Sequence, residues 1–94
     1  MNAEEFMRLH ADNAVAGNMP EVLKDLTPEV MAKLGALMAG VAPPFTGSSV
    51  TAVSGGSGDA IFDVTYTADA GKVDWRETVR QIDGTWKIVD IVAR

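Results

Sequence analysis

An Asp-Gly pair at residues 83–84 constrains the fold of this chain more than any other short segment. Apolar and polar residues alternate on both sides of it, over Val73–Ile82 and Thr85–Ala93. Asp-Gly between two such runs predicts a β-hairpin with a two-residue turn. Counted back along both strands from that turn, Glu77 falls opposite Asp90. The sequence therefore predicts two carboxyl groups side by side on one face of a hairpin.

The face that carries the two acids is otherwise apolar, apart from Gln81. A tight turn at Ala70-Gly71 adds residues 60–68 to the same sheet and places Tyr66 opposite Trp75. Both turns select the same inward face, which supports the register. The residues on this face that are candidates for the wall of a ligand site or the core are Phe62, Val64, Tyr66, Trp75, Val79 and Ile88.

The chain divides into a helical half, residues 3–39, and a strand half, residues 48–93. Helical periodicity covers residues 3–16, with a stop at Gly17-Asn18, then residues 20–26, and then a segment with Thr27 as N-cap and Pro28 in its first turn. The strand patterns cover residues 48–54, 60–68, 73–82 and 85–93. Such segregation predicts an α+β fold in one domain, residues 1–94, with the helices packed on a four-stranded antiparallel meander.

Composition excludes several classes of function. The net charge is −5 and the basic residues are scattered, so nucleic acids and anionic membranes are poor partners. The chain has no cysteine and one histidine, so we expect neither disulfides nor a metal site, and no motif indicates a cofactor. It begins without a signal-peptide pattern and has no apolar stretch long enough to span a bilayer. We expect a soluble cytoplasmic protein.

The acid pair suggests a site for proton chemistry. Two carboxylates at cross-strand distance in an apolar setting cannot both ionise cheaply, so the pKa of one should rise. A carboxyl group with a raised pKa suits general acid–base catalysis near neutral pH. His10 and Asn13 lie on the inward side of the first helix and could point at the acids. Tyr66 would supply a hydrogen-bond donor, and Trp75 an aromatic wall.

A purely structural interpretation explains the same residues. A lone histidine on an apolar helix face is usually a satisfied core residue, and either acid could pair with His10 or lie in water at an open rim. The aromatic residues could simply fill the core. A β-bulge in the last hairpin would separate Glu77 from Asp90.

The order of three helices followed by a meander, with the closing strand Asp83-Gly84-Thr85-Trp86-Lys87-Ile88-Val89-Asp90, resembles the nuclear transport factor 2-like superfamily. The segment Leu26-Thr27-Pro28-Glu29 also resembles its small uncharacterised members. The resemblance implies a cystatin-like cone in which helices pack into a curved sheet, with Glu77, Asp90, Tyr66 and His10 at inner positions. It also implies a homodimer through the outer sheet face, for which Ile61, Val89 and Ile91 form an apolar strip.

That superfamily contains isomerases, dehydratases, hydrolases and cyclases as well as non-catalytic binding and dimerisation domains. We expect this chain to bind a small, partly apolar ligand inside the cone, with walls formed by Asn13, Phe62, Val64, Trp75, Val79 and Ile88. One alternative is a cofactor-independent isomerase, dehydratase or hydrolase, with Glu77 or Asp90 as base and the other acid or Tyr66 as proton donor. The other is a structural dimerisation module. Of these, a non-enzymatic role is preferred.

Overall fold

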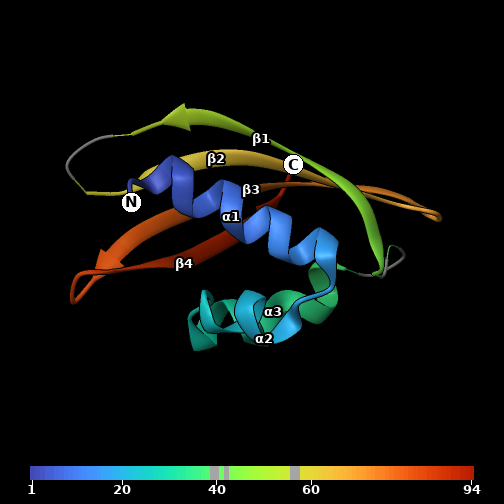
Figure 1. Ribbon diagram of the computed structural model, residues 1–94, viewed down its shortest axis with the longest axis horizontal. Coiled ribbons are helices and arrows are strands. Elements are labelled where there is room, and N and C mark those ends of the chain that lie inside the picture. The colour runs from blue at the N-terminus through green and yellow to red at the C-terminus, as the bar shows by residue number, and fades with distance from the viewer. Residues whose placement is uncertain (39–40, 42, 56–57) are drawn as a thin grey trace.

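The computed structural model describes residues 1–38, 41, 43–55 and 58–94, and residue 39, the expected end of the helical half, lies outside these ranges. Three helices precede four strands (Figure 1): α1 (Ala3–Ala16), α2 (Met19–Lys24), α3 (Pro28–Leu37), β1 (Phe45–Ser54), β2 (Ala60–Ala68), β3 (Gly71–Ile82) and β4 (Thr85–Ala93). The strands form one antiparallel meander in the order β1-β2-β3-β4. The predicted α+β class is confirmed. None of the helices in these ranges is long and apolar enough to cross a membrane.

Local signals set the ends of α1, which has its predicted bounds. The backbone N–H of Glu5 donates to the Asn2 side chain at 2.8 Å, and the Asn2 N–H donates to the Glu5 carboxylate at 2.9 Å. This reciprocal capping box satisfies two N–H groups that would otherwise lack partners at the start of the helix. At the other end Gly17 adopts a left-handed conformation with φ 76°, which stops the helix as expected.

The segment between α2 and α3 bonds to the outer edge of β4 at Ile88. The Ile88 N–H donates to the Asp25 carbonyl at 2.8 Å, and the Thr27 N–H donates to the Ile88 carbonyl at 3.2 Å. Leu26 thereby forms a short parallel bridge with Ile88. Asp25 caps α2 and Leu26 already pairs with the strand, so α2 ends at Lys24 rather than at the predicted Leu26.

The turn between β2 and β3 lies one residue earlier than predicted. Ala68 pairs with Gly71, so Tyr66 lies opposite Val73 and not opposite Trp75. The register differs from the prediction by two residues, and an even shift keeps every side chain on its predicted face. The Asp83-Gly84 turn forms as expected, with positive φ at both residues and Ile82 paired with Thr85.

A β-bulge in β4 separates the predicted acid pair. Val79 pairs with Ile88 but Thr78 pairs with Asp90, so Val89 is an extra residue in β4. Beyond the bulge Glu77 lies opposite Ile91, and the predicted pairing of Glu77 with Asp90 is wrong. The bulge directs Ile91 into the core in place of a second carboxyl group, which avoids a large desolvation cost.

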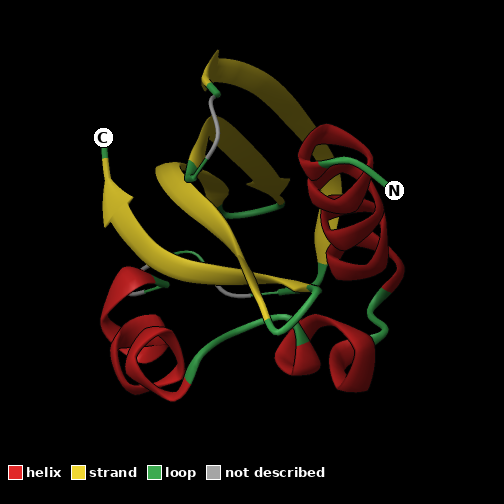
Figure 2. Ribbon diagram, turned by 90° about the vertical axis from the view of Figure 1, so that its left-hand side faces the viewer, coloured by secondary structure: helices red, strands yellow, loops and turns green. Residues whose placement is uncertain are grey.

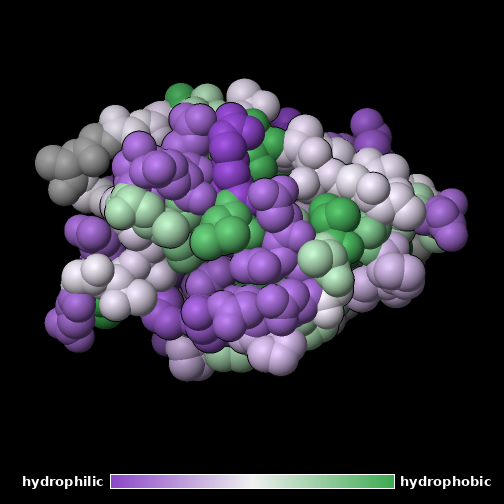
Figure 3. All heavy atoms as spheres, viewed as in Figure 1, coloured by the Kyte–Doolittle hydropathy of each residue, from purple (hydrophilic) through white to green (hydrophobic). Residues whose placement is uncertain are grey.

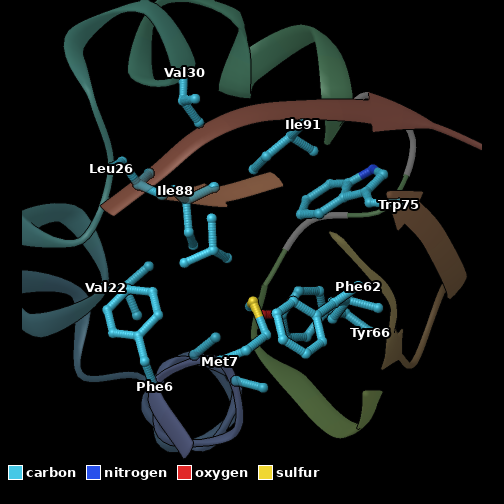
Figure 4. Close-up of a cluster of buried hydrophobic side chains, with 14 of the residues drawn as sticks. Phe6, Met7, Val22, Leu26, Val30, Phe62, Tyr66, Trp75, Ile88 and Ile91 are labelled. Atoms are coloured by element: carbon cyan, nitrogen blue, oxygen red, sulfur yellow. The ribbon is translucent and has the colours of Figure 1, made fainter. Parts of the chain in front are cut away.

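The helices pack on the inner face of a curved sheet, with α1 along the β1 side and α3 along the β4 side (Figure 2). Between them lies one hydrophobic core (Figure 4), whose members include Phe6, Met7, Leu26, Phe45, Phe62, Tyr66, Trp75, Ile88 and Ile91. The exterior in the view of Figure 3 is mostly hydrophilic, with small separate hydrophobic patches. Most of the predicted site residues lie in or beside this core, namely His10, Phe62, Val64, Tyr66, Trp75, Glu77, Val79 and Ile88.

Candidate functional site

The acidic residue Glu77 lies at the centre of the core. β3 holds it between Phe62 of β2 and Ile91 of β4, and its side chain has 0% exposure. Neither carboxylate oxygen has a hydrogen-bond partner in the described structure. Burial raises the pKa of Glu77 to about 7, against a smaller opposing effect of His10. Near neutral pH this carboxyl group can therefore both take up and release a proton.

His10 reaches the core from α1 and is held by an acid that sequence reasoning missed. Its Nδ1 donates to Oδ2 of Asp25 at 2.9 Å, and the His10 ring is only 4% exposed. A signal for this contact existed, because helices on either side of the Gly17-Asn18 turn bring residues equally distant from it close together. His10 and Asp25 are such a pair. The hydrogen bond fixes the orientation of the imidazole ring.

The hydroxyl oxygen of Tyr66 is a further buried polar atom without a hydrogen-bond partner among the described residues. Burial, and then the charge of Glu77, raises the pKa of Tyr66 well above its ordinary value, so the phenol stays neutral. The ring stacks on Phe45 with centroids 4.9 Å apart and meets Trp75 edge-on at 5.7 Å. Three aromatic rings thus form a continuous cluster beside Glu77.

These groups line a small cavity between the helices and the sheet, called here the inner pocket. It is lined by His10, Ala14, Met19, Val22, Leu26, Leu34, Met38, Phe45, Tyr66, Trp75, Glu77 and Ile91. Its volume is about 30 Å³, room for roughly two water molecules at about 10–15 Å³ each. The wall is almost entirely apolar, so the few polar groups define what can bind there.

Four of the predicted site residues meet at this pocket, namely Glu77, His10, Tyr66 and Trp75. Four others, Phe62, Val64, Val79 and Ile88, are buried in the core but do not line it. Asn13 lines a separate outer cleft instead, together with Trp86.

Asp90 does not belong to the site, contrary to the sequence prediction. The bulge leaves its side chain 53% exposed, where it accepts a hydrogen bond from Nζ of Lys33 at 2.6 Å. The raised pKa predicted for one member of an acid pair is found at Glu77, but its cause is burial rather than a neighbouring carboxylate.

The outer sheet face also differs from expectation. Ile91, predicted to belong to an outer apolar strip, is 2% exposed and points into the core (Figure 4). The outer face instead carries ion pairs. Arg76 donates twice to Asp63, at 2.8 and 3.2 Å, and Arg94 lies 3.4 Å from the same carboxylate. The strip of Ile61, Val89 and Ile91 is therefore not formed.

No family model matches the chain, and no curated protein or solved structure matches it significantly. Within the described ranges, no three His, Asp or Glu side chains gather as a metal site would require. The resemblance to the nuclear transport factor 2-like superfamily, including its conical shape, stays a prediction from sequence.

Proposed function

We propose that this protein binds a small, partly apolar molecule in the inner pocket. The supporting observation is that the carboxyl group of Glu77 and the hydroxyl of Tyr66 are both buried at the pocket wall, with no partner among the described residues. A buried polar group left without a hydrogen bond costs about 1–3 kcal/mol. Two such groups beside one cavity are well explained if a ligand supplies their partners.

The size of the pocket limits the ligand to a few non-hydrogen atoms unless the walls move. Met19, Leu34 and Met38 are only partly buried, and all three come from the helical side of the pocket. Methionine side chains are unbranched and adapt to different shapes. A somewhat larger ligand can therefore be accommodated by rotation of Met19 and Met38, without a change in the sheet.

A screen of small molecules by NMR tests this proposal. Ala14 lines the pocket and is buried, so Ala14→Leu should fill it, whereas Ala16→Leu adds the same side chain at an exposed site on the same helix. We expect compounds that shift the Trp75 and Tyr66 signals of the wild type and of Ala16→Leu, with at least tenfold weaker binding to Ala14→Leu.

Binding that survives equally in Ala14→Leu would place the ligand outside the inner pocket and contradict the proposal. A full screen in which no compound shifts Trp75 or Tyr66 would instead support the structural module considered from the sequence. The homodimer and the cytoplasmic location remain predictions that the screen does not address.

A second function, catalysis of proton transfer, is favoured by one further observation. The pKa of Glu77, raised to about 7 by burial, suits a general base that works at neutral pH. In this reaction the Glu77 carboxylate removes a proton from carbon next to a carbonyl group, and returns a proton to the product. The electron pair moves to the carbonyl oxygen, where the Tyr66 hydroxyl would donate a hydrogen bond.

Deuterium exchange into small ketones in heavy water tests for this activity. We expect exchange that rises with pH around a midpoint near the Glu77 pKa of about 7 and is lost in Glu77→Gln. Exchange at equal rates in the variant and in the wild type would exclude Glu77 as the base.

A further inference from the structure

We infer that the ligand of the inner pocket is a small alkylamine in its protonated form, bound between the carboxylate of Glu77 and the aromatic rings of the pocket. This inference rests on the proposed function, because it names the chemical class of the molecule that the pocket takes. It follows from the charges, the rings and the apolar surface that surround Glu77.

The positive charge of the ligand follows from the absence of a lysine or arginine among the described residues of the pocket wall. The lining includes one carboxyl group and one imidazole. The imidazole of His10 is already bonded to Asp25, whose negative charge offsets a proton on the ring. His10 therefore compensates an ionised Glu77 only in part, because its effect on the Glu77 pKa is smaller than the effect of burial. A buried carboxylate is stable only when a cation or several hydrogen bonds compensate it, and a bound ammonium group supplies both.

The aromatic cluster favours the same class of ligand. Phe45, Tyr66 and Trp75 all line the pocket, and their rings contact one another at centroid distances of 4.9 and 5.7 Å. Aromatic ring faces carry partial negative charge and attract ammonium and alkylammonium groups, most strongly where water is excluded. The oxygen of the Tyr66 hydroxyl can also accept an N–H hydrogen bond. The rings thus add to the attraction that Glu77 provides.

The rest of the pocket requires that the cation carry an apolar group. Apart from Glu77, His10 and the aromatic cluster, the lining residues are aliphatic side chains and methionines, namely Ala14, Met19, Val22, Leu26, Leu34, Met38 and Ile91. A hydrated inorganic cation would leave these surfaces without contacts, whereas an alkyl group would bury apolar surface against them. An amine with about four carbon atoms combines both properties, and it fits once Met19 and Met38 rotate to enlarge the pocket.

A matched pair of probes, isobutylammonium chloride and isobutanol, tests the inference by isothermal titration at constant ionic strength. The two molecules have nearly the same shape and differ in charge. At pH 8 we expect the wild type to bind the amine at least tenfold more tightly than the alcohol. Glu77→Gln should lose this preference and keep its affinity for the alcohol. Asp90→Asn, which removes an exposed carboxylate, should behave as the wild type does.

The pH dependence provides a second test that needs no variant. The ionisable groups that face Glu77 are His10 on α1, with its partner Asp25, and Tyr66 on β2. Burial sets the pKa of Glu77 at about 7, so its ionised fraction falls roughly tenfold between pH 8 and pH 6. The amine, with a pKa near that of lysine at about 10.4, stays protonated throughout. Its affinity should fall about tenfold over this range, and that of the alcohol should stay constant.

The outcomes separate this inference from the proposed function. Equal binding of both probes, or an amine preference that persists in Glu77→Gln, would overturn the inference and leave a pocket for neutral ligands. Binding of neither probe would also overturn it, while the wider screen described above decides whether the pocket binds anything. If Glu77→Gln does not fold, a constant amine affinity between pH 6 and pH 8 in the wild type would overturn it.

Discussion

The state of Glu77 is set by its surroundings rather than by its own chemistry. A carboxyl group with an ordinary pKa of 4.5 is ionised at neutral pH, but burial in this core raises the pKa to about 7. The folded protein therefore binds a proton that the unfolded chain releases between pH 4.5 and pH 7. Folding is favoured by this proton below pH 4.5, and the stabilisation is lost as the pH rises through the folded pKa.

This difference predicts how stability depends on pH. A shift from 4.5 to about 7 corresponds to roughly 3 kcal/mol. The wild type should lose about this amount relative to Glu77→Gln between pH 4.5 and pH 8, because the variant stays neutral. Urea denaturation at several pH values measures it, with exposed Asp90→Asn as control. Parallel pH profiles for the wild type and Glu77→Gln would show that Glu77 titrates normally.

The sequence predicts the inward position of Glu77 and a raised pKa for one of the two acids, but neither which acid carries it nor its cause. The alternation of a strand determines which face a side chain occupies, and that is how Glu77, Tyr66 and Trp75 were found. Contacts between the ends of neighbouring helices leave no such periodic trace. Asp25, which orients His10, was therefore missed, although its distance from the Gly17-Asn18 turn offered a geometric clue.

At the level of elements, the bulge at Val89 has the largest consequences. Without it, Asp90 would lie in the core beside Glu77, and Ile91 would face outward. Burying an isoleucine side chain contributes about 1.5–3 kcal/mol, whereas a second buried carboxyl group would cost energy. A bulge has no local sequence signature, because valine fits equally well into a regular strand. The turns at Gly17 and Asp83-Gly84, by contrast, were predicted correctly since these residues adopt positive φ at little cost, whereas the β2–β3 turn was predicted one residue too late.

Two alanine substitutions distinguish the bulged strand from a regular one. Ile91 is 2% exposed, so Ile91→Ala should destabilise the protein by about 2–5 kcal/mol. The side chain of Asp90 is 53% exposed and pairs with Lys33 at the surface, so Asp90→Ala should cost about 0–1 kcal/mol. The free energy of unfolding from urea titrations measures both. A larger loss of stability for Asp90→Ala than for Ile91→Ala would show that β4 is a regular strand without the bulge.

At the scale of the whole molecule, the separation of helical and strand patterns along the chain correctly predicts an α+β fold with a meander sheet. What could not be predicted is how residues 25–27 lie along β4, because two backbone hydrogen bonds to a distant strand have no side-chain signature. The homodimer also stays a prediction. The apolar side chains left for it on the outer face, Ile61, Val89 and Val92, are interrupted by the Arg76–Asp63 ion pair.

Sedimentation equilibrium tests the predicted dimer. Val92 is 45% exposed on β4, and Val53 is 44% exposed on β1 at the other side of the sheet. If the dimer forms through the outer face near β4, Val92→Lys should weaken it at least roughly tenfold, or ~1.4 kcal/mol, while Val53→Lys leaves it unchanged. A monomer at all concentrations, or dissociation caused by Val53→Lys alone, would contradict this prediction.

The bonding of β4 to the segment between α2 and α3 has a consequence for assembly. Open sheet edges are where chains add to one another, and a subunit with two open edges can extend without limit into a filament. In the described residues no strand pairs with the outer side of β1, whereas the outer side of β4 is bonded at Ile88 to Asp25 and Thr27. A regular strand could pair along β1 but would be blocked at Ile88 on β4, so strand addition between copies is favoured at β1, where two copies can join as a closed pair.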